Sequence, residues 1–339
     1  MAGLPRPPLR HLLLVALALM LGSLLIGPSG GVSLAEVWHW CLQRLSCGTL
    51  AGEPADAMVE AVLLDVRLPR VLLAFLVGAA LTVSGAALQA MFRNPLVSPD
   101  ILGLSSGAAF GAALAVSLPF LPLQPTAFLG GLLAVAASYF LARRAEGVSL
   151  VALILAGIIV SGVFTALLAT VQFLTDPFRL QTIVHWTMGN LHQASWSKLA
   201  SAAGPILAGL GWLYLLRWRM NVMALGDAEA RAVGLDPERE KLLILLPATL
   251  VASAAVAVAG IIGLVGLAVP HMVRLLVGPD QVRALPVAIL CGGALLLLVD
   301  DCSRSLTAFE LPVGIFTTLI GGPFFIYLLG SRRLGGWGG

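Results

Sequence analysis

The clearest chemical pattern in the chain is Gly103-Leu104-Ser105-Ser106-Gly107, which matches the G-x-S-x-G sequence around the nucleophile of serine hydrolases. Such an enzyme needs a histidine within hydrogen-bond reach of the serine. None of the five histidines lies centrally in a predicted helix that faces Ser105. A serine hydrolase is therefore only our third interpretation, and we expect the small residues here to serve helix packing.

Metal and nucleotide chemistry have no recognisable motif in the sequence. There is no HExxH, no CxxC and no cluster of acidic residues, so we expect neither a metal site nor a directly bound cofactor. The two lysines, Lys198 and Lys241, do not follow a glycine-rich loop, and a GxxxxGK[ST] phosphate-binding loop is absent. If ATP drives this protein, the ATP and its Mg must be bound by another polypeptide.

The composition indicates what kind of element positions these residues. Hydrophobic residues make up 59% of the 339 residues, charged residues 11%, and the mean hydropathy is +0.97. These values are typical of an integral membrane protein, and the long apolar segments favour an all-α helical bundle over a β-barrel. We expect one domain, residues 1–339, with about ten transmembrane helices at 12–26, 68–91, 100–117, 124–142, 150–173, 197–216, 240–259, 263–277, 284–302 and 313–330.

Residues 67–107 are central to the predicted fold, and their sequence predicts a helix, a turn and a second helix. Asn94 and Pro95 should end the first helix, since a residue before proline leaves the α region and proline donates no hydrogen bond. Ser98 should cap the second helix, with Asp100 in its first turn.

The distribution of basic residues predicts the orientation. With both termini in the cytoplasm, fourteen Lys and Arg residues lie inside and six outside, as the positive-inside rule requires. A cleaved signal peptide is the competing interpretation of the first apolar run. We expect residues 29–65 to include an interfacial helix on the outer face, where Cys41 and Cys47 either form a disulfide or remain thiols.

Motifs along nearly the whole chain carry a resemblance to a known family. They are Arg67-Leu68-Pro69-Arg70, Gly85 to Gln89, Asn94-Pro95-Leu96, Leu102 to Gly107, Trp186 to Leu191, Leu225 to Gly234, Gly263 to Arg274 and Glu310 to Gly322. In this order they resemble the FecCD family, the membrane permeases of ABC importers for iron-siderophores, haem and cobalamin. The resemblance implies an inner-membrane permease that pairs with a second copy or a close paralogue, two cytoplasmic ATPase subunits and a periplasmic substrate-binding protein. It implies no enzyme activity in the chain and no nucleic-acid partner.

The longest polar break on the predicted cytoplasmic side is residues 221–241. Its glycines suggest two short helices bent at those positions, and a solvated amphipathic loop is the alternative. The resemblance implies that this is the loop through which the ATPase acts on the permease. The residues predicted for this coupling are Leu225, Gly226, Asp227, Ala230 and Gly234.

Three arginines, Arg67, Arg70 and Arg304, are predicted at the outer ends of helices. The resemblance implies that they receive acidic residues of the binding protein, a task for which the planar guanidinium is suited. Simple anchoring at the membrane interface is the alternative. The resemblance also places a cytoplasmic gate near Ser149 and Leu150, although Leu150 stands where more polar gate residues can occur.

The remaining candidates are assigned to helix packing or to the transport path. They are Gly85, Asn94, Pro95, Gly103, Ser105, Ser106 and Gly107. Gly85 and Pro95 recur at an offset of 175 residues as Gly260 and Pro270, which suggests an inverted repeat of helices 2–5 and 7–10.

The predicted helices contain few charges, and this bears on the energy source. An ion-coupled secondary carrier usually has ionisable groups at mid-membrane, so it is our main alternative of another class. The small number of charges favours an energy source outside the lipid. It also predicts a path lined by small and apolar residues, which is suited to a bulky chelate as the transported substrate. The resemblance is greatest to ferric-siderophore members at residues 98–107, and haem and cobalamin stay open.

Overall fold

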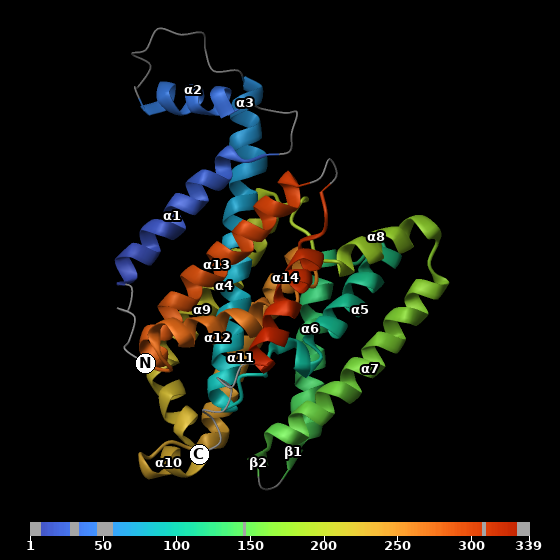
Figure 1. Ribbon diagram of the computed structural model, residues 1–339. Helices are drawn as coiled ribbons and strands as arrows, with labels where there is room; N and C mark the ends of the chain where they lie inside the picture. Colours follow the sequence, from blue (N-terminus) through green and yellow to red (C-terminus); the bar gives the residue numbers. More distant parts are fainter. Residues whose placement is uncertain (1–7, 28–33, 46–56, 145–146, 307–309, 331–339) are drawn as a thin grey trace.

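The structure, a computed structural model, describes residues 8–27, 34–45, 57–144, 147–306 and 310–330 (Figure 1). Within these ranges it confirms the all-α helical bundle. The α-helices are α1 Leu9–Leu25, α2 Leu34–Leu45, α3 Ala57–Ala61, α4 Leu68–Met91, α5 Leu104–Ser117, α6 Leu123–Ala142, α7 Leu150–Leu174, α8 Pro177–Thr187, α9 Trp196–Leu225, α10 Asp227–Ala232, α11 Pro237–Ala259, α12 Val265–Val277, α13 Gln281–Ser305 and α14 Val313–Gly330. A π-helical turn, Val62–Arg67, joins α3 to α4, a 3-10 turn occupies Pro99–Leu102, and β1 Arg143–Arg144 pairs antiparallel with β2 Gly147–Val148.

In the part of the chain that the structure describes, six continuous helical segments are long and apolar enough to cross a membrane. They are Ala57–Met91, Leu123–Ala142, Leu150–Leu174, Trp196–Leu225, Pro237–Ala259 and Gln281–Ser305. Four shorter apolar helices are Leu9–Leu25, Leu104–Ser117, Val265–Val277 and Val313–Pro323. Each of the ten predicted segments falls on one of these helices.

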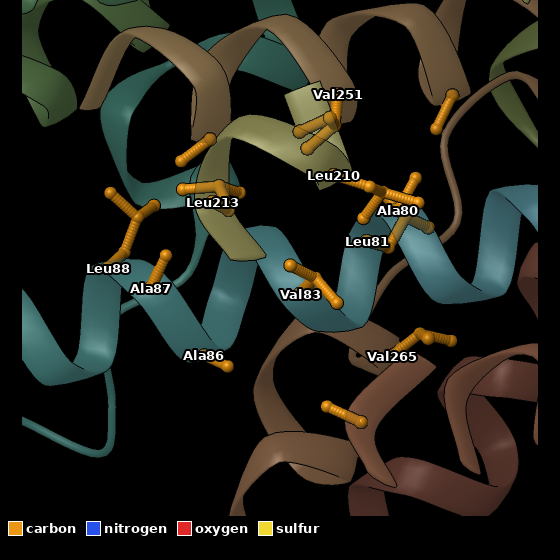
Figure 2. Close-up of a cluster of buried hydrophobic side chains, with 14 of the residues drawn as sticks. Ala80, Leu81, Val83, Ala86, Ala87, Leu88, Leu210, Leu213, Val251 and Val265 are labelled. Atoms are coloured by element: carbon orange, nitrogen blue, oxygen red, sulfur yellow. The ribbon is translucent and has the colours of Figure 1, made fainter. Parts of the chain in front are cut away.

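Helix α4 is the centre of the bundle. It contacts α1, α9, α11, α12 and α13, and most of its residues are buried. In Figure 2 its apolar side chains lie between Leu210 and Leu213 of α9 and Val251 of α11 on one side, and Val265 of α12 on the other. Packing around this helix explains why a 24-residue segment with almost no polar face is stable here.

Glycines set the closest helix contacts, as predicted for Gly85 and Gly107. A Cβ built on Gly85 would overlap with the carbonyl oxygen of Gly266 in α12, and one on Gly107 would overlap with that of Gly130 in α6. Only residues without a side chain allow backbones to approach this closely. The small-residue stretches therefore bring α4 against α12 and α5 against α6.

The turn after α4 differs in detail from the prediction. Asn94 closes it through its side-chain oxygen, which accepts a hydrogen bond from the Leu96 N–H at 2.8 Å. Ser98 stands at the cap position of the 3-10 turn, but its side chain makes no capping hydrogen bond. The predicted helix 100–117 is interrupted because Gly103 adopts a left-handed conformation, with φ of 84°, and α5 begins only at Leu104.

Helix α9 is longer than predicted, and this changes the limits of the polar break. It extends to Leu225 rather than to residue 216, so the charged residues Arg217 and Arg219 lie on a continuous helix. Arg217 stacks 3.7 Å above the ring of Tyr214, and Arg219 bonds to Glu240 of α11 at 2.8 Å. These contacts let the helix carry two arginines beyond its apolar part.

The helix predicted at the outer face is α2, which lies across one end of the bundle beside α3 (Figure 1). Its Val37 is buried in a small cluster with Val59 and Leu63. Cys47 lies outside the described residues, so the question of a disulfide with Cys41 stays a prediction.

Candidate functional sites at the two ends of the bundle

The candidate residues gather at opposite ends of the molecule. Helix α10 and the β1–β2 hairpin share one end, and α2 and α3 lie at the other (Figure 1). We call them the α10 end, predicted to be cytoplasmic, and the α2 end, predicted to be outside.

The predicted coupling segment has one short helix, α10, and not two. Residues 221–225 are the last turn of α9, and residues 237–241 are the first turn of α11. Gly226 and Gly234 bound the short helix with φ of 147° and 83°, conformations that favour glycine. The bends predicted at the two glycines are therefore present.

Helix α10 is fixed on one side and exposed on the other. Ala230 is fully buried against the main core, and Asp227 bonds to Lys241 of α11 at 2.8 Å. Leu225 and Val233 are 68% and 59% exposed. The exposed side of this short helix is therefore flanked by two apolar side chains.

The predicted gate residues begin α7. The Ser149 hydroxyl oxygen accepts a hydrogen bond from the Ala152 N–H at 3.2 Å and so caps the helix, and Leu150 is its first residue. The β1–β2 hairpin immediately precedes them, with Arg143 paired to Val148. Any movement of the hairpin would therefore act directly on the start of α7.

At the α2 end, Arg70 is buried between two acidic residues. Its guanidinium donates to both oxygens of Asp300 in α13, at 2.9 Å and 3.0 Å, and to both oxygens of Glu310, at 2.9 Å and 3.0 Å. Asp300 is fully buried, and the Arg70 side chain is 7% exposed. Paired, hydrogen-bonded charges of this kind are the form in which ions are found inside proteins.

Arg304 and Arg67 are buried as well and contact the end of α1. Arg304 donates to the carboxylate of Asp301, to the carbonyl oxygen of Ser23 at 2.9 Å and to that of Ile26 at 2.7 Å. The Ser23 hydroxyl donates to Asp301 at 2.6 Å, and Arg67 donates to the Leu24 carbonyl oxygen at 3.0 Å. These bonds make α1 an integral part of the bundle.

The structure thus brings together the three arginines that are predicted to dock a partner. Each of them, however, donates hydrogen bonds to groups of its own chain. The acidic partners of Arg70 and Arg304, which are Asp300, Asp301 and Glu310, were not predicted from the sequence. The spacing of Asp300 and Asp301 from Arg304, four and three residues on one helix, could have indicated the pairing. The docking role itself stays a prediction.

Two adjoining cavities lie near these arginines, with volumes of about 300 Å³ and 370 Å³. Both are lined by His185, Asn190 and His192, and the larger one also by Arg70 and Glu310. Partial burial lowers the pKa of His192, and the carboxylate of Glu310 partly opposes this shift. The lining is suited to hydrogen bonding with a polar solute.

The serine-hydrolase interpretation gains no support from the described residues. The Ser105 hydroxyl donates to the Asp100 carboxylate, which is not the base of a hydrolase triad, and Ser106 lies half-buried beside it on α5. Among the described residues no three His, Cys, Asp or Glu side chains are grouped so as to hold a metal ion.

Comparison with known proteins gives consistent matches over almost the full length. The model of the FecCD transport family matches residues 12–331. The cobalamin import system permease protein of Halobacterium salinarum is 43% identical over 84% of this chain and 76% of its own. An iron chelatin transport system permease protein of Helicobacter pylori is 37% identical over 94% of this chain and 98% of its own. A solved structure described as an inward-facing conformation of a metal-chelate type ABC transporter is 37% identical, with a TM-score of 0.81 over 95% of this chain and 98% of that one.

Proposed function

The chain belongs to the FecCD transport family and is a multi-pass membrane permease subunit of an ABC transporter, and we propose that it imports ferric siderophores through the inner membrane of a bacterium. The match to the family over residues 12–331 carries the proposal. An iron chelatin permease among its relatives supports iron chelates, whereas the cobalamin relative keeps corrinoids as the alternative and haem stays open.

The motor in this proposal is a pair of separate ATPase subunits, which bind the ATP and Mg. They contact the α10 end, where Leu225 and Val233 are exposed and apolar. Gly226 and Gly234 give the short helix between them room to tilt, because both lie at backbone bends. Closure of the ATPases then shifts the permease between outward-open and inward-open states by binding one of them better.

The transport path in this proposal lies between two copies of the chain, or between this chain and a close paralogue. Helix α7 lies at the edge of the bundle in Figure 1, and many of its large apolar side chains are exposed, among them Leu155, Ile158 and Ile159. Both lipid and a second subunit can cover such a face. The proposal also has both termini in the cytoplasm, which the distribution of basic residues supports.

The ATPase contact is tested with two substitutions on the exposed surface. Leu225→Glu together with Val233→Glu should abolish ATPase stimulation and substrate uptake, because charge replaces the apolar contact, while membrane insertion is kept. Leu306→Glu is the matched control, since Leu306 is 66% exposed and follows α13. Normal ATPase stimulation by the double variant would remove this segment from the mechanism.

The cargo is tested by uptake into vesicles that contain the permease, its ATPase and its binding protein. An iron-loaded siderophore should be accumulated with ATP, whereas haemin and cobalamin should not compete. Uptake of cobalamin alone would establish the alternative. Uptake that persists without ATP and collapses with an ionophore would favour an ion-coupled carrier.

The proposed docking of a periplasmic binding protein to Arg67, Arg70 and Arg304 needs two measurements, because all three arginines are buried. Arg67→Glu with Arg304→Glu should weaken the affinity of the folded protein for the binding protein in a salt-dependent way. If thermal stability falls and the affinity of the folded fraction is unchanged, the arginines serve only the bundle.

A further inference from the structure

Lys241 lies in the first turn of α11 and joins three separate elements at the α10 end. Its ammonium group donates to Asp227 of α10 at 2.8 Å, to Glu238 of its own helix at 2.9 Å and to the carbonyl oxygen of Val148 in β2 at 3.4 Å. The Lys241 side chain is 9% exposed. An ammonium group has three donors, and here each one has an acceptor on a different element or turn.

Glu238 completes the connection to the hairpin. One of its carboxylate oxygens accepts from Lys241, and the other accepts from the Val148 N–H at 3.0 Å. The Lys241–Glu238 pair therefore holds both backbone polar groups of Val148. Because Val148 directly precedes the Ser149 cap of α7, the pair fixes the position at which α7 begins.

The same lysine is also the side-chain connection from α11 to Asp227. Asp227 is the first residue of α10, directly after Gly226, and it is 35% exposed. Rotation at the glycine would move Asp227 together with α10. Separating the Asp227 carboxylate from the buried ammonium group would leave that charge with one partner fewer, which is costly. The Lys241 side chain should therefore move with Asp227.

We propose that Lys241 is a positioning residue that transmits a displacement of α10 to the β1–β2 hairpin and the start of α7. This rests on the proposed function, because the displacement comes from the ATPase partner. The role predicts that cutting the link leaves ATP hydrolysis intact and lowers the amount of substrate moved per ATP.

The first experiment measures ATP hydrolysed per substrate imported, in vesicles that contain the whole complex. Lys241→Met should raise this ratio by about 2- to 30-fold, the usual range for mutations between coupled sites. Lys241→Arg should restore part of the coupling. The control is Arg283→Met in α13, which removes an exposed pair of the same spacing, with Asp280 at the N-cap of that helix. An unchanged ratio in Lys241→Met would overturn the proposal.

The second experiment needs no ATPase and so separates this inference from the proposed function. Spin labels at Ala228→Cys on α10 and Arg143→Cys on β1, in a chain whose native cysteines are serines, report the distance between the two elements. The distance distribution should be narrow with Lys241 and broad with Lys241→Met. Equal widths would contradict the link even if the ATPase binds as proposed.

A variant with less effect on folding covers the case in which Lys241→Met is not stably inserted. Asp227→Asn removes a charge that is only partly buried and keeps the shape of the side chain. It should broaden the same distance distribution, and a width like that of the unchanged chain would again overturn the proposal.

Discussion

The two ends of this permease use the same kind of ion pair in different ways. At the α2 end, Arg70 contacts acids that are 230 and 240 residues away in sequence, and Asp300 is fully buried. At the α10 end, Lys241 contacts acids that are 3 and 14 residues away and about one third exposed. The first arrangement ties distant helices together, whereas the second ties a short surface helix to its neighbours.

This difference in burial indicates which end of the molecule can move. Breaking a buried, multiply bonded pair leaves a charge without water, so the α2 end should behave as a fixed joint. At the α10 end the two acids are partly hydrated, so the cluster around Lys241 can shift together with the short surface helix while its ion pairs are kept. We therefore expect the adjustable contacts to lie at the α10 end. Three substitutions test this contrast.

The largest effect is expected at the fixed joint. Asp300→Ala should destabilise the folded protein by about 3–5 kcal/mol, because it leaves the buried Arg70 and Arg304 with too few partners. Thermal unfolding of the purified protein in detergent measures the loss. Arg283→Ala, an exposed pair, should cost less than about 1 kcal/mol. A similar loss of stability in both variants would contradict the proposed difference between buried and exposed ion pairs.

A smaller effect is expected in the packing between the two ends. Gly85→Ala should cost about 1–3 kcal/mol, because the added methyl group would overlap with the Gly266 carbonyl and force α4 away from α12. Gly204→Ala is the control, since a Cβ there meets nothing within 4 Å. If both variants unfold at the same temperature, α4 and α12 are not held as close as described.

The smallest effect is expected at the start of α7. Ser149→Ala should lower stability by about 1 kcal/mol through loss of the cap, as judged by thermal unfolding. Ser197→Ala, an exposed serine in the first turn of α9, should leave the unfolding temperature nearly unchanged. A loss as large as that of Asp300→Ala would mean that the α10 end is as rigid as the α2 end.

The sequence was sufficient for the helices and for several of their ends. Apolar runs predict helices in lipid because the backbone has no other way to satisfy its hydrogen bonds there. The bends at Gly226 and Gly234 follow from the same local chemistry, since few other residues adopt these conformations. The extension of α9 to Leu225 was not predicted, because the apolar run ends before Arg217 and Arg219 and hydrophobicity alone does not show that the helix continues.

The partners of the buried arginines could not be predicted. Nothing local connects Arg70 to Asp300 or Arg304 to Ser23, because the fold alone brings these residues together. The Glu238–Lys241 pair was not predicted either, because the predicted helix began at residue 240 whereas α11 begins at Pro237. The contact of Lys241 with Val148 depends on where the hairpin lies, which the sequence does not show.

Because the chain has only two lysines, Lys198 and Lys241, chemical modification of lysine can probe the α10 end. Lys198 lies near the other end, half-buried at the start of α9, and Lys241 is enclosed by Asp227, Glu238 and Val148. An acylating reagent should therefore modify Lys198 readily and reach Lys241 only when its enclosure opens. The extent of modification of Lys241 relative to Lys198, measured at each step of the transport cycle, therefore reports when that enclosure opens.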